Sequence, residues 1–221
     1  MGIRGQEPKW CTQCNEMSGK SIFQSQAQFV GQYLEQLLNA RVWVDRADEM
    51  LEASKLLELQ IREYWSVVIA GMRKRKPGEL CSVTVRCDLH GPYFILVSYG
   101  LENLFKAIIV GERGDEIRRQ FARKGRLPDL IKGHDLVKLS RNANIEMGSE
   151  EENVLFRLSR FSKWRGRYPV PVEVCDMGSV VPDSDGKPTL TDYYAPGDVD
   201  QISAIVEKTR GHVANYVKGA S

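Results

Sequence analysis

The chain has 221 residues, of which 42% are hydrophobic and 27% are charged, and its formal net charge is +2. This composition is typical of a soluble globular protein and excludes a disordered chain. Because the charge is almost balanced, any affinity for nucleic acid has to come from a local concentration of cations. Five cysteines is an odd number and no secretory signal opens the chain, so we expect reduced thiols in a cytoplasmic protein.

The first 24 residues have no useful hydrophobic periodicity, and we expect them to form an N-terminal arm. This arm contains one CxxC pair, Cys11 and Cys14. A zinc ion needs four ligands, and the next thiols, Cys81 and Cys87, follow far along the chain with looser spacing. We therefore expect no metal site, and a small zinc-binding arm that uses Cys11 and Cys14 stays as a third reading, which metal analysis of the purified protein separates. The sequence contains no common nucleotide-cofactor motif.

Residues 25–74 are predicted to be helical, because they contain no proline and their apolar residues recur at intervals of three and four. We expect a break between two helices at residues 40–44. Pro77 and Gly78 end this helical unit. The alternating residues that follow, LCSVTVRCD, are compatible with a short strand or with an extended linker.

The most apolar stretch, residues 93–111, is about as long as a membrane span. Glu102, Asn103 and Lys106 lie near its middle and are costly in lipid, so we expect a buried central helix and no membrane. Glu102 and Lys106 are four residues apart and can pair on one helix face. Either they form a satisfied polar patch where the helix reaches solvent, or Glu102 and Asn103 line a cleft.

A shorter, polar helix is predicted over residues 111–124. A further short helix is expected to begin near His134, because either His134 or Asp135 can cap it and apolar residues follow. A histidine at such a position more commonly has a capping or packing role than a catalytic one.

The next predicted helix begins at Ser149, whose spacing to Glu152 is that of a capping box. After Pro171 we expect a loop, and then a last amphipathic helix over residues 195–217. The fold class predicted is an all-α helical bundle of about five to six helices, which forms one domain over residues 25–221.

A basic segment occupies the end of the Ser149 helix. Two aromatic residues, Trp164 and Tyr168, are interleaved there with five cations and no acid. The cations are Arg157, Arg160, Lys163, Arg165 and Arg167. A solvated helix face is the usual origin of such a run, but arginine forks suit phosphates and aromatic faces suit bases. A second basic cluster precedes His134 and consists of Arg118, Arg119, Arg123, Lys124 and Arg126.

The order of the segments carries more information than any one motif. A long amphipathic helix (VDRADEMLEASKLL) is followed by SYGLENLFKAIIV, then by GHDLVKL, and then by a helix that ends in WRGRYPVP. This succession resembles the HEPN domain, a small helical bundle of prokaryotic defence and toxin–antitoxin systems and of some eukaryotic proteins, over residues 42–217. The resemblance implies a bundle that often forms homodimers, sometimes binds nucleotides, and in many members cleaves RNA without a metal.

Nuclease members of that family carry an arginine, then four to six residues, and then a histidine. This chain departs from the pattern, because seven residues, including Pro128 and Gly133, separate Arg126 from His134. The resemblance nominates His134 and Arg167, from neighbouring helices, as catalytic residues of a metal-independent endoribonuclease. The residues nominated for RNA or nucleotide binding are Glu102, Asn103, Lys106, Arg160, Lys163, Trp164, Arg165 and Tyr168.

Besides the zinc-binding arm, two alternatives stay open on sequence alone. His134 and Arg167 can instead have a structural role, in which their polar side chains bond to Glu102 and hold the helix ends together. The domain can also be a non-catalytic module that binds a partner protein. The missing arginine–histidine spacing favours this module, whereas the aromatic residues of the basic segment favour nucleic acid.

Overall fold

The fold is an all-α helical bundle, as predicted. The computed structural model describes residues 19–74, 89–165 and 195–217, together with Val174, Gly186 and the strand residues 180–182 and 188–190. The helices are α1 (Gly19–Leu38), α2 (Ala40–Lys74), α3 (His90–Lys124), α4 (Leu136–Asn142), α5 (Ser149–Arg160), a π-helical turn η1 (Phe161–Arg165) and α6 (Asp198–Val217).

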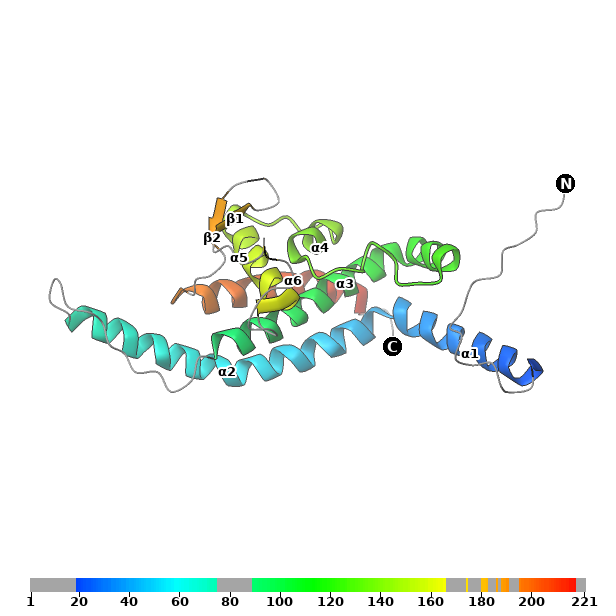
Figure 1. Ribbon diagram of the computed structural model, residues 1–221, viewed down its shortest axis with the longest axis horizontal. Coiled ribbons are helices and arrows are strands. Elements are labelled where there is room, and N and C mark those ends of the chain that lie inside the picture. Colours follow the sequence, from blue (N-terminus) through cyan, green and yellow to red (C-terminus); the bar gives the residue numbers. More distant parts are fainter. Residues whose placement is uncertain are drawn as a thin grey trace.

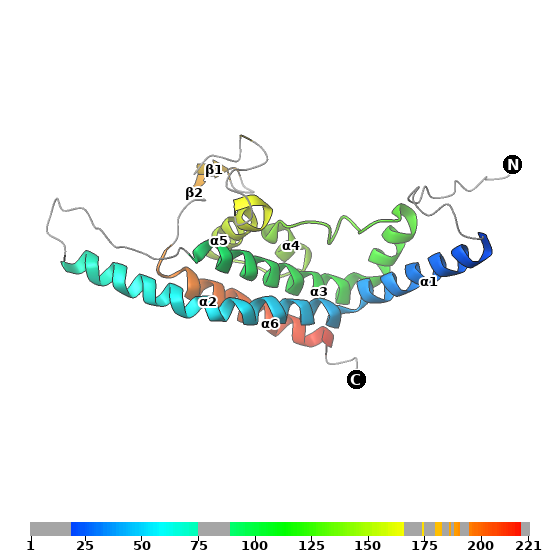
Figure 2. The same ribbon diagram turned by 60° about the horizontal axis from the view of Figure 1, so that its bottom comes forward.

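Helix α3 is the centre of the bundle (Figure 1). It packs against α2 and α6 on one side and against α4, α5 and η1 on another. Figure 2 shows the same arrangement, with α4 and α5 above α3 and with α2 and α6 below it. In both views α1 and the C-terminal end of α2 extend beyond the other helices in opposite directions.

The break between α1 and α2 falls at Asn39, one residue before the predicted range. The Asn39 side-chain oxygen accepts a hydrogen bond from the backbone N–H of Arg41 at 3.0 Å, which is the chemistry of a helix N-cap. Helix α1 begins at Gly19, so the last residues of the predicted arm are helical. The capping hydrogen bond of Asn39 therefore sets the position of the break between α1 and α2.

Helix α3 joins two predicted helices into one helix of 35 residues with a kink at Arg113, whose backbone angles are non-helical. It ends at Gly125, which adopts a left-handed conformation (φ 62°) and donates its N–H to the Phe121 carbonyl at 2.8 Å. Among the described helices, α3 is long and apolar enough to cross a membrane, and 72% of its most apolar window is buried inside the bundle. A core helix of a soluble bundle has the same properties.

Two capping predictions have different outcomes. Asp135 caps α4 by accepting a hydrogen bond from the Lys138 N–H at 3.1 Å, which is one of the two predicted caps. The predicted pair of Ser149 and Glu152 is wrong by one residue: Gly148 precedes α5, and Glu151 accepts the Gly148 N–H at 2.7 Å. Because the segment holds three consecutive glutamates, spacing alone does not identify the capping one.

The segment predicted as a loop after Pro171 contains two short antiparallel strands, β1 (Val180–Pro182) and β2 (Pro188–Leu190), with Val180 opposite Leu190. Each has three residues, which is too short to produce a clear alternation in the sequence. Helix α6 is amphipathic as predicted, with Ile202, Ile205 and Val213 of its apolar face in the core.

Candidate functional site

The central polar residues of α3 form a buried network. Lys106 Nζ donates to Glu102 Oε1 at 2.5 Å, as the spacing predicted, and both side chains are buried. The second carboxylate oxygen of Glu102 contacts His134 Nδ1 at 2.8 Å. The expectation of a polar patch where the helix reaches solvent is therefore wrong, because Glu102 lies in the core and links α3 to the segment before α4.

The network keeps Glu102 charged. Burial acts to raise the pKa of Glu102, but the hydrogen bond with His134 and the charge of Lys106 outweigh it, so its pKa lies below the ordinary value. A carboxylate next to Nδ1 holds the proton of a neutral imidazole on that nitrogen, which leaves Nε2 as the acceptor. The His134 side chain is 50% exposed, so a buried carboxylate orients a ring that solvent and ligands can reach.

Asn103, the neighbour of Glu102, lines a cleft of about 460 Å³ between the α1–α2 break, α3 and Leu127. Tyr33 and Trp43 also line it. The Asn103 amide donates to the Tyr99 carbonyl at 2.7 Å, which leaves its side-chain oxygen as the group that can accept a hydrogen bond from a ligand. The remaining lining residues are Gln36, Leu37, Val42, Asp45, Arg46 and Glu49.

The buried network and the cleft share a wall. Lys106 Nζ lies 5.6 Å from the centroid of the Trp43 ring, which is within the range of a cation–π contact. The indole N–H of Trp43 donates to the Leu37 carbonyl at 3.1 Å, which fixes the ring orientation. Three residues predicted for binding, Glu102, Asn103 and Lys106, therefore belong to one region, but only Asn103 reaches the cleft.

The second basic cluster lies in the part of the chain next to this cleft, because Arg126 precedes the lining residue Leu127, but none of its side chains lines the cleft. Tyr33 stacks on Phe121 of α3, with ring centroids 5.2 Å apart, which places the cleft next to the C-terminal part of α3. The cluster is exposed and consists of Arg118, Arg119, Arg123 and Lys124 in α3 and of Arg126, which follows the helix. Lys124 pairs with Asp129, while the four arginines have no ion pair within the part of the chain that the structure describes. They are therefore available to an anionic ligand.

The cations of the basic segment, residues 157–167, do not lie on one exposed helix face. Arg157 is buried and makes a bidentate ion pair with Asp198 at 2.9 and 2.7 Å, so its expected place on a solvated or phosphate-facing surface is wrong. Arg160 is half-buried and Lys163 is exposed. The side chains of Trp164 and Arg165, and all of Arg167 and Tyr168, lie outside the described residues, so their predicted roles stay predictions.

No metal site is present among the described residues: they contain no group of three or more His, Cys, Asp or Glu side chains that could hold a metal ion. Cys11 and Cys14 lie outside these residues.

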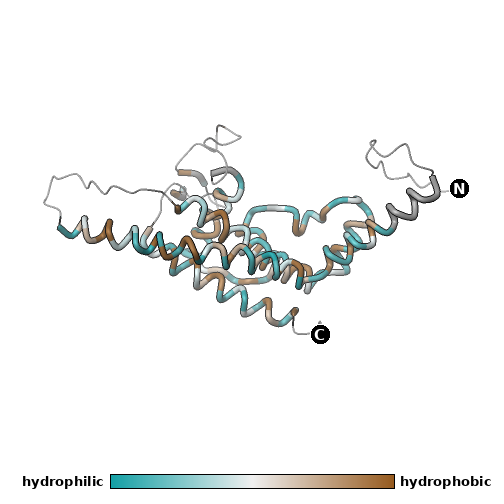
Figure 3. Tube along the Cα trace, turned by 90° about the horizontal axis from the view of Figure 1, so that it is seen from below, coloured by the Kyte–Doolittle hydropathy of each residue, from teal (hydrophilic) through white to brown (hydrophobic). Residues whose placement is uncertain are grey.

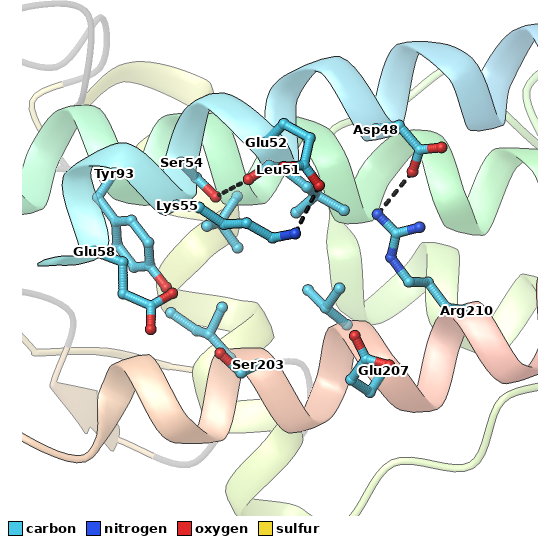
Figure 4. A pocket seen from close by; sticks show the side chains of 13 residues that line it. Asp48, Leu51, Glu52, Ser54, Lys55, Glu58, Tyr93, Ser203, Glu207 and Arg210 are labelled. Carbon is cyan, nitrogen blue, oxygen red and sulfur yellow. Dashed lines mark hydrogen bonds and ion pairs between the residues drawn. The ribbon is translucent and has the colours of Figure 1, made fainter.

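A second hollow, of about 510 Å³, lies between α2, α3 and α6 (Figure 4). Apolar side chains line it together with four carboxylates (Asp48, Glu52, Glu58 and Glu207) and two cations (Lys55 and Arg210). Asp48 pairs with Arg210 across the groove at 2.7 Å. This excess of carboxylates opposes a phosphate ligand, and none of the predicted site residues lines the groove.

Tyr33, Trp43 and Arg46 were not predicted as site residues. Their positions in the sequence look like parts of amphipathic helices, and the signal that could have found them is Asn39, which places Tyr33 and Trp43 on opposite sides of a helix break. Comparison of the chain with protein-family models, curated proteins and solved structures found no match. The geometry of the cleft and the network is therefore the basis for a functional proposal.

Proposed function

We propose that this chain is a HEPN-like domain that binds the base and phosphate of a nucleotide, either free or within single-stranded RNA, in the cleft beside Asn103. The single observation that carries the proposal is that Tyr33, Trp43 and Asn103 line one cleft next to an exposed basic cluster. No other hollow described above combines aromatic rings, an amide and neighbouring unpaired cations.

The chemistry of the cleft suits a base. Aromatic faces stack on any base, and an amide adds a directional hydrogen bond. The two carboxylates of the cleft are each neutralised, because Asp45 pairs with Arg41 at 2.7 Å and Glu49 pairs with Arg46 at 2.5 Å. The exposed arginines of the basic cluster supply the positive charge that phosphates need.

A metal-independent cleavage of RNA is the second candidate function, and the contact between Glu102 and His134 favours it. In that reaction Nε2 of His134 takes the proton of a ribose 2′-hydroxyl and the 2′-oxygen attacks the adjacent phosphorus. The bond to the 5′-oxygen breaks, and the leaving 5′-oxygen takes the electron pair and a proton from water. The products are a 2′,3′-cyclic phosphate and a 5′-hydroxyl. Arg167 is the cation that we predict to hold the phosphate.

Binding is tested by titrating fluorescently labelled single-stranded RNA with the wild-type protein and with an Arg123→Glu/Arg126→Glu variant. The matched control is Arg73→Glu, which reverses an exposed cation at the far end of α2. We expect the double variant to weaken RNA binding by about tenfold or more. The Arg73→Glu control should weaken it only by the small amount that one reversed surface charge produces. Equal affinities for all three proteins would rule out the basic cluster as the phosphate site.

Cleavage is tested by incubating the same RNA with the protein in EDTA. We expect cleavage to be lost in His134→Ala and in Arg167→Ala and to persist in His212→Ala, which removes an exposed histidine from α6. Intact RNA in the wild-type reaction would reject the nuclease function and leave the binding proposal unaffected.

A further inference from the structure

The groove between α2, α3 and α6 has an apolar floor and a charged rim (Figure 4). Its floor is made of buried Leu51, Val97, Ile202 and Val206. Figure 3 shows the same mixture at the level of the chain, with apolar and polar positions alternating along α2 and α6. The volume of about 510 Å³ lies in the range of small-molecule sites. The groove is therefore large enough for a small ligand, and the chemistry of its rim selects the kind of ligand.

Half of the charges on the rim cancel one another. Glu52 accepts from Lys55 at 2.6 Å, and Asp48 accepts from Arg210 at 2.7 Å. These two pairs contain both of the cations that line the groove. The two remaining carboxylates of the rim, Glu58 and Glu207, therefore have to find positive charge elsewhere.

The cation nearest to these two carboxylates is shared. Arg62 contacts Glu58 and also Asp200 of α6, each at 2.7 Å. Glu207 is exposed and has no ion pair within the part of the chain that the structure describes. Three carboxylates therefore face one guanidinium, which leaves an excess of two negative charges. A ligand that neutralises this excess carries at least two positive charges.

The carboxylates are spread along the groove and do not converge on one point. Figure 4 shows Glu58 at one end and Asp48 and Glu207 toward the other. Asp48 and Glu58 are ten residues apart on α2, which at a rise of 1.5 Å per residue corresponds to about 15 Å. Among the described residues no three potential metal ligands are grouped closely enough to hold an ion. The rim therefore suits an extended ligand with separated positive charges better than a metal ion.

Tyr93 of α3 brings an unpartnered hydroxyl to this groove. Its side chain lines the groove and is only 1% exposed, and its hydroxyl makes no hydrogen bond within the described residues. Burial and the charge of Glu58 raise the pKa of Tyr93, so the phenol keeps its proton. Buried hydroxyls in folded proteins normally have a partner. The oxygen of Tyr93 can accept a hydrogen bond from an ammonium group of a ligand.

We propose that the groove binds a linear aliphatic polyamine, whose methylene groups lie on the apolar floor and whose ammonium groups contact the carboxylates of the rim and the Tyr93 hydroxyl. Burial of the methylene groups and charge-assisted hydrogen bonds both favour such a ligand. The groove and the cleft assigned to RNA have no lining residue in common, so this site is independent of the proposed RNA binding.

Isothermal titration calorimetry of the whole chain with spermidine at low salt tests this site. We expect one saturable site in the wild type. Tyr93→Phe removes only the unpartnered hydroxyl, so it should weaken spermidine binding about fivefold, the effect of one hydrogen bond. The unfolding temperature of this variant without ligand should be equal to that of the wild type or higher, because no hydrogen bond of the free protein is lost.

Two charge variants accompany this titration. Glu207→Gln should weaken spermidine binding severalfold, because it removes the carboxylate that lacks an ion pair. Glu63→Gln is the matched control, at an exposed carboxylate of α2 that does not line the groove, and it should bind spermidine as the wild type does. A titration without saturable heat, or equal affinities for all four proteins, would overturn the proposal.

Other cationic probes identify the class of ligand. Butylamine has one ammonium group and Mg²⁺ concentrates its charge on one ion, so each should bind about tenfold or more weakly than spermidine, which engages several carboxylates at once. Equal affinity for Mg²⁺ would overturn the assignment of a linear polyamine. A lysine-rich peptide that binds more tightly than spermidine and is weakened by Tyr93→Phe would overturn it in favour of a peptide ligand.

Discussion

Glu102 is the residue on which the buried network depends. Its carboxylate contacts Lys106 on its own helix and His134 thirty-two positions along the chain. Removing one partner of a buried ion pair leaves the other charge without compensation, which commonly costs about 3–5 kcal/mol. The network therefore ties α3 to the α4 segment as well as orienting His134.

Glu102→Gln should lower the free energy of unfolding by a few kcal/mol at neutral pH, and by less in acid. The pKa of Glu102 is lowered in the folded chain, so its contribution is fully present above the ordinary glutamate value and is lost as the pH falls through the lowered folded value. Urea unfolding of both proteins at pH 7 and near pH 4 measures this difference. Glu207→Gln, at an exposed carboxylate of α6, is the control and should show neither effect. A constant difference at both pH values would contradict the lowered pKa.

At the scale of elements, α2 and α3 approach each other closely at Gly100. A Cβ built on Gly100 would lie 2.6 Å from Cγ of Leu51, which is nearer than such atoms pack. Overpacking of this kind in a core usually costs about 1–3 kcal/mol. The glycine therefore permits the contact between the two longest helices.

Gly100→Ala should thus lower the free energy of unfolding by about 1–3 kcal/mol. Gly211→Ala in α6 is the matched control, because nothing lies within 4 Å of its added methyl group. The control should be stabilised by up to about 1 kcal/mol, the gain in helix propensity. Chemical denaturation of both variants measures the contrast, and equal changes would mean that α2 and α3 do not meet at this glycine.

The ion pair between Arg157 and Asp198 joins α5 to the start of α6. Asp198 also accepts the Ala195 N–H at 2.8 Å, so it orders the turn before α6. Arg157→Met should cost about 3–5 kcal/mol of unfolding free energy. Arg62→Met, which breaks the exposed contacts to Glu58 and Asp200, should cost about 1 kcal/mol or less. Similar losses in the two variants would contradict the buried character of the first pair.

The helices and the contacts between residues close in sequence could be predicted from the sequence, whereas most contacts between residues far apart in sequence could not. Helical periodicity located the helices, and i,i+4 spacing located the contact of Glu102 with Lys106. The contact of His134 with Glu102 was one of two alternatives that the sequence left open. Nothing in the sequence places Asp198 next to Arg157, because that contact crosses the bundle. Arg157 resembled a solvated cation because its partner lies forty-one positions away. The aromatic cleft was missed because Tyr33 and Trp43 meet only through the helix break.

At the scale of the whole molecule, the cleft and the carboxylate-rich groove have different lining: Asn103, Tyr33 and Trp43 line the cleft, whereas four carboxylates line the groove. RNA should therefore bind at the cleft and its neighbouring cations, and binding should weaken as salt rises. Fluorescence anisotropy at two salt concentrations measures this. An affinity that does not change with salt would contradict phosphate contacts at the basic cluster.

The most direct test of the central claim is hydrogen–deuterium exchange of the protein with and without single-stranded RNA, because it reports where the ligand binds. We predict that RNA slows exchange at residues 33–46, at residues 99–106 and at the basic cluster of α3. We expect no change in α6 residues 202–210, which line the carboxylate-rich groove. Protection confined to that groove, or unchanged exchange at saturating RNA, would contradict binding at the cleft.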